Sequence, residues 1–385
     1  MIKRRDFISV CSALGILGCQ SYANTSRFNG SVTIIGAGVA GMAVGHLLSQ
    51  RGIDFTIVEA APSYGGRVKT LHDFVDFPVP LGGEWLHVDE HVLRQIVNDD
   101  SVEVATELAA YESQSSYGFY SNGRLQVDPI GDDLDEFSDK KFINGTWLTF
   151  FEQYVLPGIR PQMRFDSVVT SIDYSKNNVS VSLADGGELE SDAVVVTVPP
   201  QVIRDGDIEF TPQLPKRKQN AFRDASIWGG MKVFIEFKEK FYPTYLEIAR
   251  TNSPRGQKLY YDAAYGQKSL ANVLGIFLVG DPANPYQSRT GDALRDYVLD
   301  ELDAIFDDVA SRSYLKHVAQ DWNKQKFIRQ AYYADSADWR LPPRMQSSLG
   351  RKVFFAGDTY TDGEDWGSVH AAANSAREAV EALLG

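Results

Sequence analysis

Short apolar runs, each bounded by glycine or by charged residues, divide the chain into elements of regular structure. Val32–Ile35 and Phe55–Val58 have the size and composition of buried strands, and the longer run between them predicts a helix. Gly52 is placed to end that helix. Two later runs, 193–198 and 352–358, also predict buried strands. The pattern therefore predicts an α/β protein built on a parallel sheet.

Strands of a second kind alternate apolar and polar residues. Val179–Leu183 alternates strictly and is followed by a turn, which predicts a small sheet open on one face. A later run with the same period puts Lys232 on one face with Phe234 and Glu236. Residues 118–127 predict a hairpin, because the Asn-Gly pair within them suits a two-residue turn. Helical runs are predicted at 92–97, 102–110, 291–310 and 368–384.

The first strand leads directly into three glycines with the spacing G-x-G-x-x-G. Gly36 permits a tight turn, Gly38 lets backbone N–H groups approach a pyrophosphate, and Gly41 lets the helix pack closely. The N-terminus of that helix adds partial positive charge. Glu59 ends the second strand, where it would accept hydrogen bonds from ribose hydroxyls, and its charge argues against a 2′-phosphate. These features together predict a βαβ unit that binds a dinucleotide.

Two further glycine-rich segments indicate which dinucleotide is bound. Gly66 and Arg67 end a second glycine turn, from which the cation could reach the same pyrophosphate. Gly83, Glu84 and Trp85 lie within the sequence Leu-Gly-Gly-Glu-Trp-Leu-His. In both segments the chain resembles the flavin-containing amine oxidases, the family of monoamine and polyamine oxidases. The resemblance implies FAD as cofactor and an α/β fold, with a Rossmann-type FAD-binding domain interleaved with an α+β substrate domain.

The same resemblance assigns roles to residues in the middle of the chain. A backbone group near Val169 would hold the adenine. Lys232 matches the lysine that holds a water near flavin N5 in this family, although a strand lysine in contact with solvent is the simpler reading. Ala331 stands where some members carry a cysteine bonded to the flavin, so FAD is expected to bind non-covalently. Tyr332 stands at one wall of the family's aromatic cage, with a buried core tyrosine as the alternative.

The C-terminal block resembles the family's second contact with FAD. Gly357 and Asp358 follow an apolar strand, and the carboxylate could bond the ribityl chain. The helix that starts near Ser368 and Val369 would point N–H groups at flavin N1 and the C2 carbonyl, which stabilises the reduced anion. The family's second cage aromatic is replaced by Ser368, and Trp366 is near enough to substitute for it. This difference suggests an amine other than a typical monoamine.

Composition and charge exclude several other classes of protein. The chain has 385 residues, with 38 Lys and Arg against 51 Asp and Glu, and its net charge is −13. No basic run suggests nucleic acid as a partner. Both cysteines lie within the first nineteen residues, so no disulfide framework or thiolate metal site is expected in the folded part. The six histidines show no ligand spacing, and no metal is expected.

Residues 1–19 predict an export signal rather than a folded element. Residues 3–8, Lys-Arg-Arg-Asp-Phe-Ile, resemble a twin-arginine signal, and the apolar stretch after them is too short to span a bilayer. The sequence Ile-Leu-Gly-Cys that ends at Cys19 resembles a bacterial lipoprotein cleavage box, with an incidental cysteine as the alternative. The expected location is the periplasm or the outer membrane, with a lipid on Cys19 as the only link to the membrane.

The resemblance implies an FAD-dependent oxidoreductase that converts the CH–NH bond of a small-molecule amine to an imine. Hydride would pass from the α-carbon to flavin N5, water would hydrolyse the imine, and O2 or a periplasmic electron carrier would reoxidise the flavin. The FAD-binding domain is expected at 30–85, 160–205 and 345–385, and the substrate-binding domain at 86–159 and 206–344.

Three other functions stay open on the sequence alone. An amino acid oxidase would need an arginine for the substrate carboxylate, and Arg94, Arg160 and Arg164 are candidates that the sequence does not place. A flavoprotein that desaturates or isomerises a lipid shares the N-terminal fingerprint, but the strand of Lys232 and the segment at Trp85 argue against it. A non-catalytic FAD-binding protein of the same fold is the third.

Overall fold

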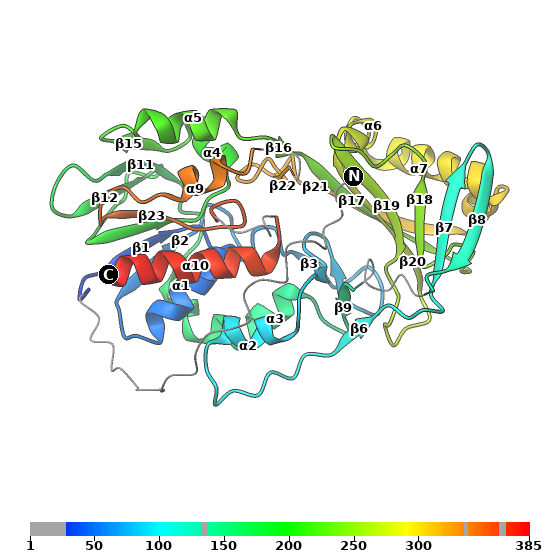
Figure 1. Ribbon diagram of the computed structural model, residues 1–385, viewed down its shortest axis with the longest axis horizontal. Helices are drawn as coiled ribbons and strands as arrows, with labels where there is room; N and C mark the ends of the chain where they lie inside the picture. Colours follow the sequence, from blue (N-terminus) through cyan, green and yellow to red (C-terminus); the bar gives the residue numbers. More distant parts are fainter. Residues whose placement is uncertain (1–27, 132–137, 335–337, 362–366) are drawn as a thin grey trace, which may run out of the picture.

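A computed structural model describes residues 28–131, 138–334, 338–361 and 367–385. The predicted export signal with Cys19, and Trp366, lie outside the described residues, so both stay predictions. Within the described ranges, no helix combines the length and the apolar character needed to cross a bilayer. Two large sheets form separate lobes, joined near the middle of the molecule (Figure 1).

The first lobe is built on the parallel sheet that the apolar runs predict. Its strand order is β10-β2-β1-β14-β23, and every neighbouring pair is parallel. In the central register Val32 pairs with Phe55 on one side and with Ala193 on the other. The strands span Met163–Arg164 (β10), Phe55–Val58 (β2), Val32–Ile35 (β1), Ala193–Val196 (β14) and Val353–Phe355 (β23).

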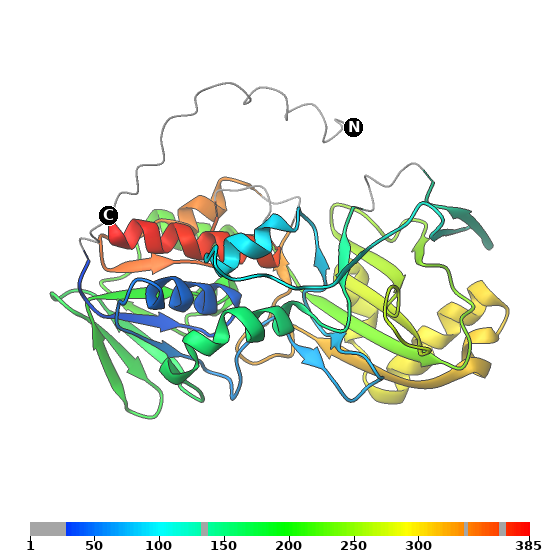
Figure 2. The same cartoon turned by 90° about the horizontal axis from the view of Figure 1, so that it is seen from below.

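Alternate residues of these strands pack into two different cores. Ile34 and Val195 pack with α1 (Val39–Ser49) and α10 (Val369–Leu384), which lie side by side on one face (Figure 2). Ile35 and Val194 pack on the other face against α9 (Leu341–Gln346) and against a four-stranded sheet with two further helices. Those elements are β11 (Val169–Asp173), β12 (Val179–Leu183), β13 (Glu188–Ser191), β15 (Glu209–Thr211), α4 (Pro200–Arg204) and α5 (Lys216–Asp224).

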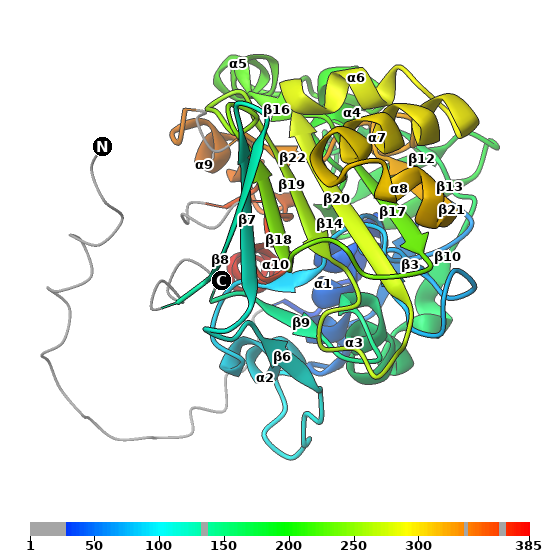
Figure 3. The same ribbon diagram turned by 90° about the vertical axis from the view of Figure 1, so that its right-hand side faces the viewer.

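The second lobe is a seven-stranded sheet in the order β21-β17-β20-β19-β18-β7-β8 (Figure 3). One face packs against α7, and it includes Val233 and Ile276. The opposite face includes Phe234 and Tyr261 and points toward the first lobe. The strands span Tyr314–Asp321 (β21), Gly230–Phe237 (β17), Asn272–Gly280 (β20), Gly256–Asp262 (β19), Tyr245–Ile248 (β18), Ser116–Ser121 (β7) and Arg124–Pro129 (β8).

Smaller elements connect the lobes. Three strands form one short sheet, β5 (Trp85–Leu86), β9 (Lys140–Phe142) and β6 (Leu108–Ala110). Two-stranded ladders join β3 (Thr70–Leu71) to β4 (Val79–Pro80) and β16 (Ile227–Trp228) to β22 (Tyr332–Tyr333). The remaining helices are α2 (His91–Val97), α3 (Trp147–Tyr154), α6 (Asn284–Gln287), α7 (Gly291–Phe306), α8 (Val309–Ser313) and α9 (Leu341–Gln346).

Two of the helix predictions are wrong, and each has a local reason. Residues 102–110 are extended and end in β6, where Leu108 pairs with Phe142 and so gains a ladder partner that a helix would lack. The helix predicted at 291–310 ends at Phe306, because Asp307 and Asp308 both adopt left-handed backbone conformations, and α8 then starts separately. The predicted hairpin is confirmed, with Asn122 and its glycine both at positive φ.

Candidate active site

In the described part of the chain, a large cavity lies between the carboxyl ends of β1, β2 and β14 and the inward face of the seven-stranded sheet. Its volume is about 2130 Å³. A pocket for one drug-sized ligand measures about 300–1,000 Å³, so this cavity has room for a dinucleotide and a second molecule. Every predicted site residue in the described ranges lines the cavity, with the exception of Gly41.

The glycines at the start of α1 bring the helix onto the sheet. Gly36 has a φ of +105°, a conformation that side chains disfavour. A Cβ on Gly41 would lie 1.9 Å from the carbonyl oxygen of Gly36, so Gly41 sets the packing of helix on strand and does not face the cavity. No side chain in the described part of the chain caps the N-terminus of α1. Its first N–H groups are therefore available to an anion at Gly38.

Glu59 joins the two glycine loops through its carboxylate. One oxygen accepts a hydrogen bond from the Ala37 N–H at 2.6 Å and the other from the Ala61 N–H at 2.8 Å. Burial raises the pKa of Glu59, and these two N–H donors oppose that shift. Gly66 lies so close to Gly38 that a Cβ on Gly66 would be 3.2 Å from the Gly38 Cα. This glycine cradle, open to a helix N-terminus and ending in a carboxylate, fits the pyrophosphate and ribose of FAD.

Arg67 and Asp358 contact each other across the middle of the cavity. The guanidinium donates to both carboxylate oxygens, one of them at 2.9 Å, and also to the carbonyl of Ala331. The sequence assigned this arginine and this aspartate to two different parts of FAD, and the structure places them in one bidentate pair on the cavity wall. Ser368 is the N-cap of α10, and its hydroxyl accepts from the Ala371 N–H at 3.1 Å.

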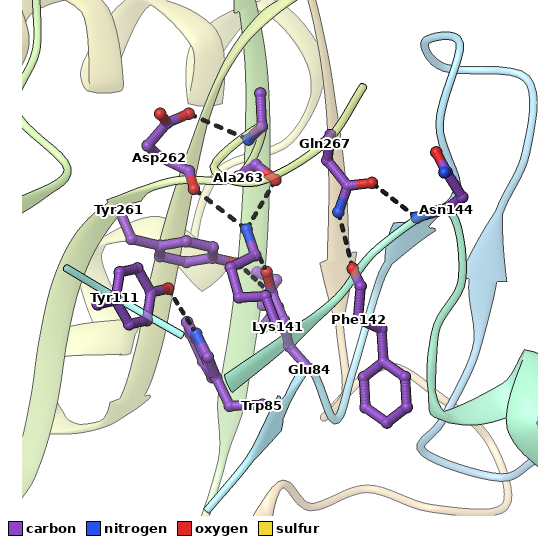
Figure 4. Close-up of polar contacts among 12 residues, drawn as sticks. Glu84, Trp85, Tyr111, Lys141, Phe142, Asn144, Tyr261, Asp262, Ala263 and Gln267 are labelled. Carbon is purple, nitrogen blue, oxygen red and sulfur yellow. Dashed lines mark hydrogen bonds and ion pairs between the residues drawn. The ribbon is translucent and has the colours of Figure 1, made fainter. Parts of the chain in front are cut away.

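The far wall carries a buried cluster of charged groups centred on Glu84 (Figure 4). One carboxylate oxygen is 2.6 Å from the Lys232 ammonium and also accepts from the Tyr261 hydroxyl. The other oxygen is 3.2 Å from the ammonium of Lys141, which also donates to the carbonyls of Asp262 and Ala263. Glu84, Lys141 and Lys232 are each at most 5% exposed. Lys232 therefore has a fixed ionic partner and is not a solvated strand lysine.

The charged groups of the cluster and their burial act on one another's pKa values. Burial alone would raise the pKa of Glu84, but the two ammonium groups outweigh burial and lower it, so the carboxylate is ionised. Burial also lowers the pKa of Lys232, and Glu84 opposes that shift. Burial raises the pKa of Tyr261 well above its ordinary value, so this phenol is neutral. Two lysines beside one carboxylate leave no unpaired negative charge that would attract a cation to the position beside Lys232.

Aromatic side chains surround Lys232 on the cavity side. The Trp85 ring lies 4.8 Å from its ammonium. The Phe277 ring meets Trp85 edge-on at 6.2 Å and lies nearly parallel to Tyr332, with 6.5 Å between the ring centroids. Phe277 and Tyr332 both line the cavity, as the predicted cage position requires of Tyr332. These aromatic rings limit the access of water to the Lys232 ammonium.

Three residues of this wall were not among the sequence candidates: Lys141, Tyr261 and Phe277. Lys141 lies on β9, which pairs with β5 and so brings the ammonium of Lys141 to Glu84. Tyr261 and Phe277 lie on strands whose period of two could have marked their common face. No group of three potential metal ligands occurs within the described ranges.

Two lobes with a βαβ unit that opens on a shared cavity are the arrangement of a dinucleotide-binding protein. Comparison with known protein families supports a dinucleotide-binding protein and narrows the family. A family model described as flavin containing amine oxidoreductase matches residues 160–384, and one for an NAD(P)-binding Rossmann-like domain matches residues 34–99. The first match covers more than half of the chain, so the protein belongs to the flavin-containing amine oxidoreductase family.

The curated relatives are distant but span almost the whole chain. Probable polyamine oxidase 4 of Arabidopsis thaliana is 22% identical over 89% of this chain and 84% of its own length. Polyamine oxidase 3 of Oryza sativa subsp. japonica is 23% identical over 91% of this chain and 88% of its own.

Solved structures share the fold. Wild-type putrescine oxidase bound to putrescine has a TM-score of 0.73 at 15% identity, covering 91% of this chain and 98% of the other. Cyclohexylamine oxidase from Brevibacterium oxydans IH-35A has a TM-score of 0.73 at 16% identity, covering 92% and 99%. With its family established, the protein is an FAD-dependent amine oxidase or dehydrogenase.

Proposed function

We propose that this enzyme oxidises a primary or secondary amine with non-covalently bound FAD, and that Lys232 acts at the reacting end of the cavity. The observation that carries this proposal is the position of the Lys232 ammonium. It is 4% exposed, paired with Glu84, and directed at the cavity between the glycine cradle and the aromatic wall.

The residues that would hold FAD follow the length of the cavity. Gly36, Gly38 and the N-terminus of α1 would bind the pyrophosphate, with Glu59 at the ribose and Val169 at the adenine. The Arg67–Asp358 pair would contact the ribityl region. Trp85 and the loop at Gly83 would lie against the flavin ring. The N-terminus of α10, at Ser368 and Val369, would face N1 of that ring.

Attachment is proposed to be non-covalent because the described part of the chain has no cysteine. Position 331 is alanine, and both cysteines of the chain precede residue 20. When bound, FAD would supply the electron acceptor for the hydride that the amine α-carbon loses. The chain's own residues then have to hold the amine neutral and keep bulk water out.

Lys232 and the aromatic side chains would meet those two needs. Because Glu84 is already paired with two lysines, the cluster would not stabilise an ammonium, and the amine would bind beside Lys232 in its free form. Phe277 and Tyr332 would flank the amine and exclude water, and Lys232 would hold one ordered water. The imine product would hydrolyse after leaving this wall. O2 or a periplasmic electron carrier is the proposed acceptor for the electrons.

The open alternative of an amino acid oxidase has little support from the cavity. Arg94, Arg160 and Arg164 are absent from its lining. The two arginines that line it within the described ranges, Arg67 and Arg329, are engaged by Asp358 and Asp207. A substrate carboxylate would have to displace one of these pairs.

The test is Lys232→Met, with Lys316→Met on the same sheet as the matched control. We expect Lys232→Met to retain FAD, because Lys232 is remote from the glycine cradle, and to slow flavin reduction or reoxidation by about 100-fold. Anaerobic bleaching of flavin absorbance by a panel of amines, followed by reoxidation in stopped flow, measures both steps. Unchanged rates in both half-reactions would remove Lys232 from the site, and a wild-type flavin that no amine bleaches would overturn the proposed activity.

A further inference from the structure

A second, much smaller cavity adjoins the charged wall. Its volume is about 10 Å³, which is close to the space that one buried water needs. Within the described ranges, Glu84 is the residue that lines both this cavity and the main one. The second cavity is near the surface of the protein, because Pro78, Gly145 and Gln267 line it and are each only half-buried. Glu84 therefore stands between Lys232 and a water-sized space near the surface.

The two oxygens of the Glu84 carboxylate have different surroundings. Oε2 accepts hydrogen bonds from the Lys232 ammonium and the Tyr261 hydroxyl. Oε1 is buried and accepts no hydrogen bond from the described residues, although the Lys141 ammonium lies 3.2 Å away. A buried polar atom of this kind is costly unless an ordered water completes its hydrogen bonding. Because Glu84 lines the second cavity, a water there can donate to Oε1.

Lys141 is the second charged group at this space. Its ammonium has three N–H groups, and it donates to the carbonyls of Asp262 and Ala263. One N–H is left for Glu84 or for a water in the second cavity, which Lys141 also lines. Figure 4 shows Lys141 between the Glu84 carboxylate and these two carbonyls. Lys141 is 2% exposed and does not line the main cavity, so Glu84 is its link to Lys232.

Reoxidation by O2 would need a proton at the position of Lys232. A hydride consists of two electrons and one proton, and O2 that accepts two electrons leaves as H2O2 only with two protons. One further proton therefore has to be supplied. The Lys232 ammonium can donate it and then has to regain a proton before the next turnover. The aromatic rings around Lys232 limit the supply of that proton from the main cavity.

On the proposed function as its basis, we propose that Glu84, Lys141 and one water in the second cavity form a proton path that recharges Lys232 without using the main cavity. Lys141 gives a proton to Oε1 of Glu84, and the carboxyl group turns about its terminal bond, a torsion with two equivalent states. Glu84 then gives the proton to the Lys232 amine. Lys141 regains a proton from solvent through the water. One proton moves at each step, and no electrons move.

The test follows proton uptake by the holoenzyme during reoxidation. Light, with EDTA as electron donor, reduces the flavin without an amine substrate, and the reduced enzyme is mixed with O2 in a weakly buffered solution of a pH indicator dye. Flavin absorbance reports reoxidation, and the dye reports the proton taken from solvent. We expect proton uptake to keep pace with reoxidation in wild type and to lag behind it by about 100-fold in Lys141→Met.

Two further variants separate proton transfer from charge and from folding. Lys141→Arg keeps the positive charge, but a guanidinium does not release a proton near neutral pH, so its proton uptake should lag as in Lys141→Met. Lys258→Met removes a buried lysine of the same sheet that lines neither cavity, and it should behave as wild type. The path is overturned if uptake keeps pace with reoxidation in Lys141→Met, if Lys141→Arg restores the wild-type behaviour, or if O2 does not reoxidise wild type.

A crystal structure of the holoenzyme gives an independent measurement. We expect electron density for one water in the second cavity, within hydrogen-bond distance of Glu84 Oε1 and the Lys141 ammonium. A second cavity without this density would also overturn the path. Neither measurement uses an amine, so a failure of the proposed amine oxidation would be distinguishable from a failure of the proton path.

Discussion

Two lysines are buried to nearly the same extent in this protein and are held in opposite ways. Lys232 on β17 is 4% exposed and has Glu84 at 2.6 Å. Lys218 on α5 is 2% exposed, and its ammonium donates to the carbonyls of Met345 and Ser347 at the end of α9, over the ring of Phe355. Within the described ranges, no carboxylate forms an ion pair with Lys218.

The comparison shows how the partners of each buried ammonium act on its pKa. Burial lowers the pKa of Lys218 to about 7, with no anion to oppose it, so this lysine can lose its proton near neutral pH. Burial also lowers the pKa of Lys232, but Glu84 opposes the shift. A lysine held by carbonyl oxygens closes the end of a helix, whereas a lysine held by a carboxylate keeps a charge at the cavity.

The largest effect is expected from removing the carboxylate. Glu84→Ala leaves Lys232 and Lys141 buried with no counter-charge, and breaking a buried pair in this way costs about 3–5 kcal/mol of unfolding free energy. Urea unfolding followed by circular dichroism measures the loss. Glu247→Ala, which removes a half-buried carboxylate with no ion pair among the described residues of the same cavity, is the control and should cost little. A loss in Glu84→Ala no larger than in the control would mean that water replaces the carboxylate at both lysines.

A smaller effect, visible only through its pH dependence, is expected at Lys218. The unfolded chain keeps this proton up to about pH 10.4, while the folded protein releases it near pH 7, so stability rises with pH between these values. Relative to Lys218→Met, wild type should gain roughly 2 kcal/mol of unfolding free energy from pH 7 to pH 9 and show no slope below pH 6. A constant difference across this range would mean that Lys218 stays charged in the fold.

The smallest effect is expected at another buried lysine, Lys258. Like Lys232 it has a carboxylate partner, and like Lys218 it also donates to an uncharged oxygen. Its ammonium is 2.7 Å from Glu301 and 3.1 Å from the Tyr286 hydroxyl, but the Glu301 side chain is 26% exposed. Lys258→Met leaves a carboxylate that water can reach, so we expect a loss of about 1–2 kcal/mol, between exposed and buried pairs. The same urea titration measures it, and a loss as large as in Glu84→Ala would show that exposure of the partner does not matter.

The dinucleotide half of the cavity could be predicted because its chemistry is local in sequence. Strand, glycines, helix and Glu59 all fall within residues 32–59, and each glycine has a steric reason that the spacing already implies. The buried strand at 193–196 and the final helix could also be predicted from the sequence, because an apolar run and a serine N-cap depend only on neighbouring residues.

The charged wall could be predicted only in part, because it depends on pairings between distant strands. Lys232 was found by resemblance, but its partner Glu84 lies 148 positions earlier in the chain. Lys141 reaches the cluster only through the register of β9 against β5. Trp366 lies outside the described residues, so its predicted role stays a prediction.

The order of strands in the parallel sheet also has a consequence for biosynthesis. Its edge strand β23 and the helix α10 that covers it come from residues 353–384, while β1 and β2 come from residues 32–58. Asp358, the partner of Arg67, lies on the same late segment. The ribosome therefore has to make residues 353–384 before β23 can complete the sheet and before Arg67 can pair with Asp358. A variant that lacks β23 and α10 should be unable to retain the flavin.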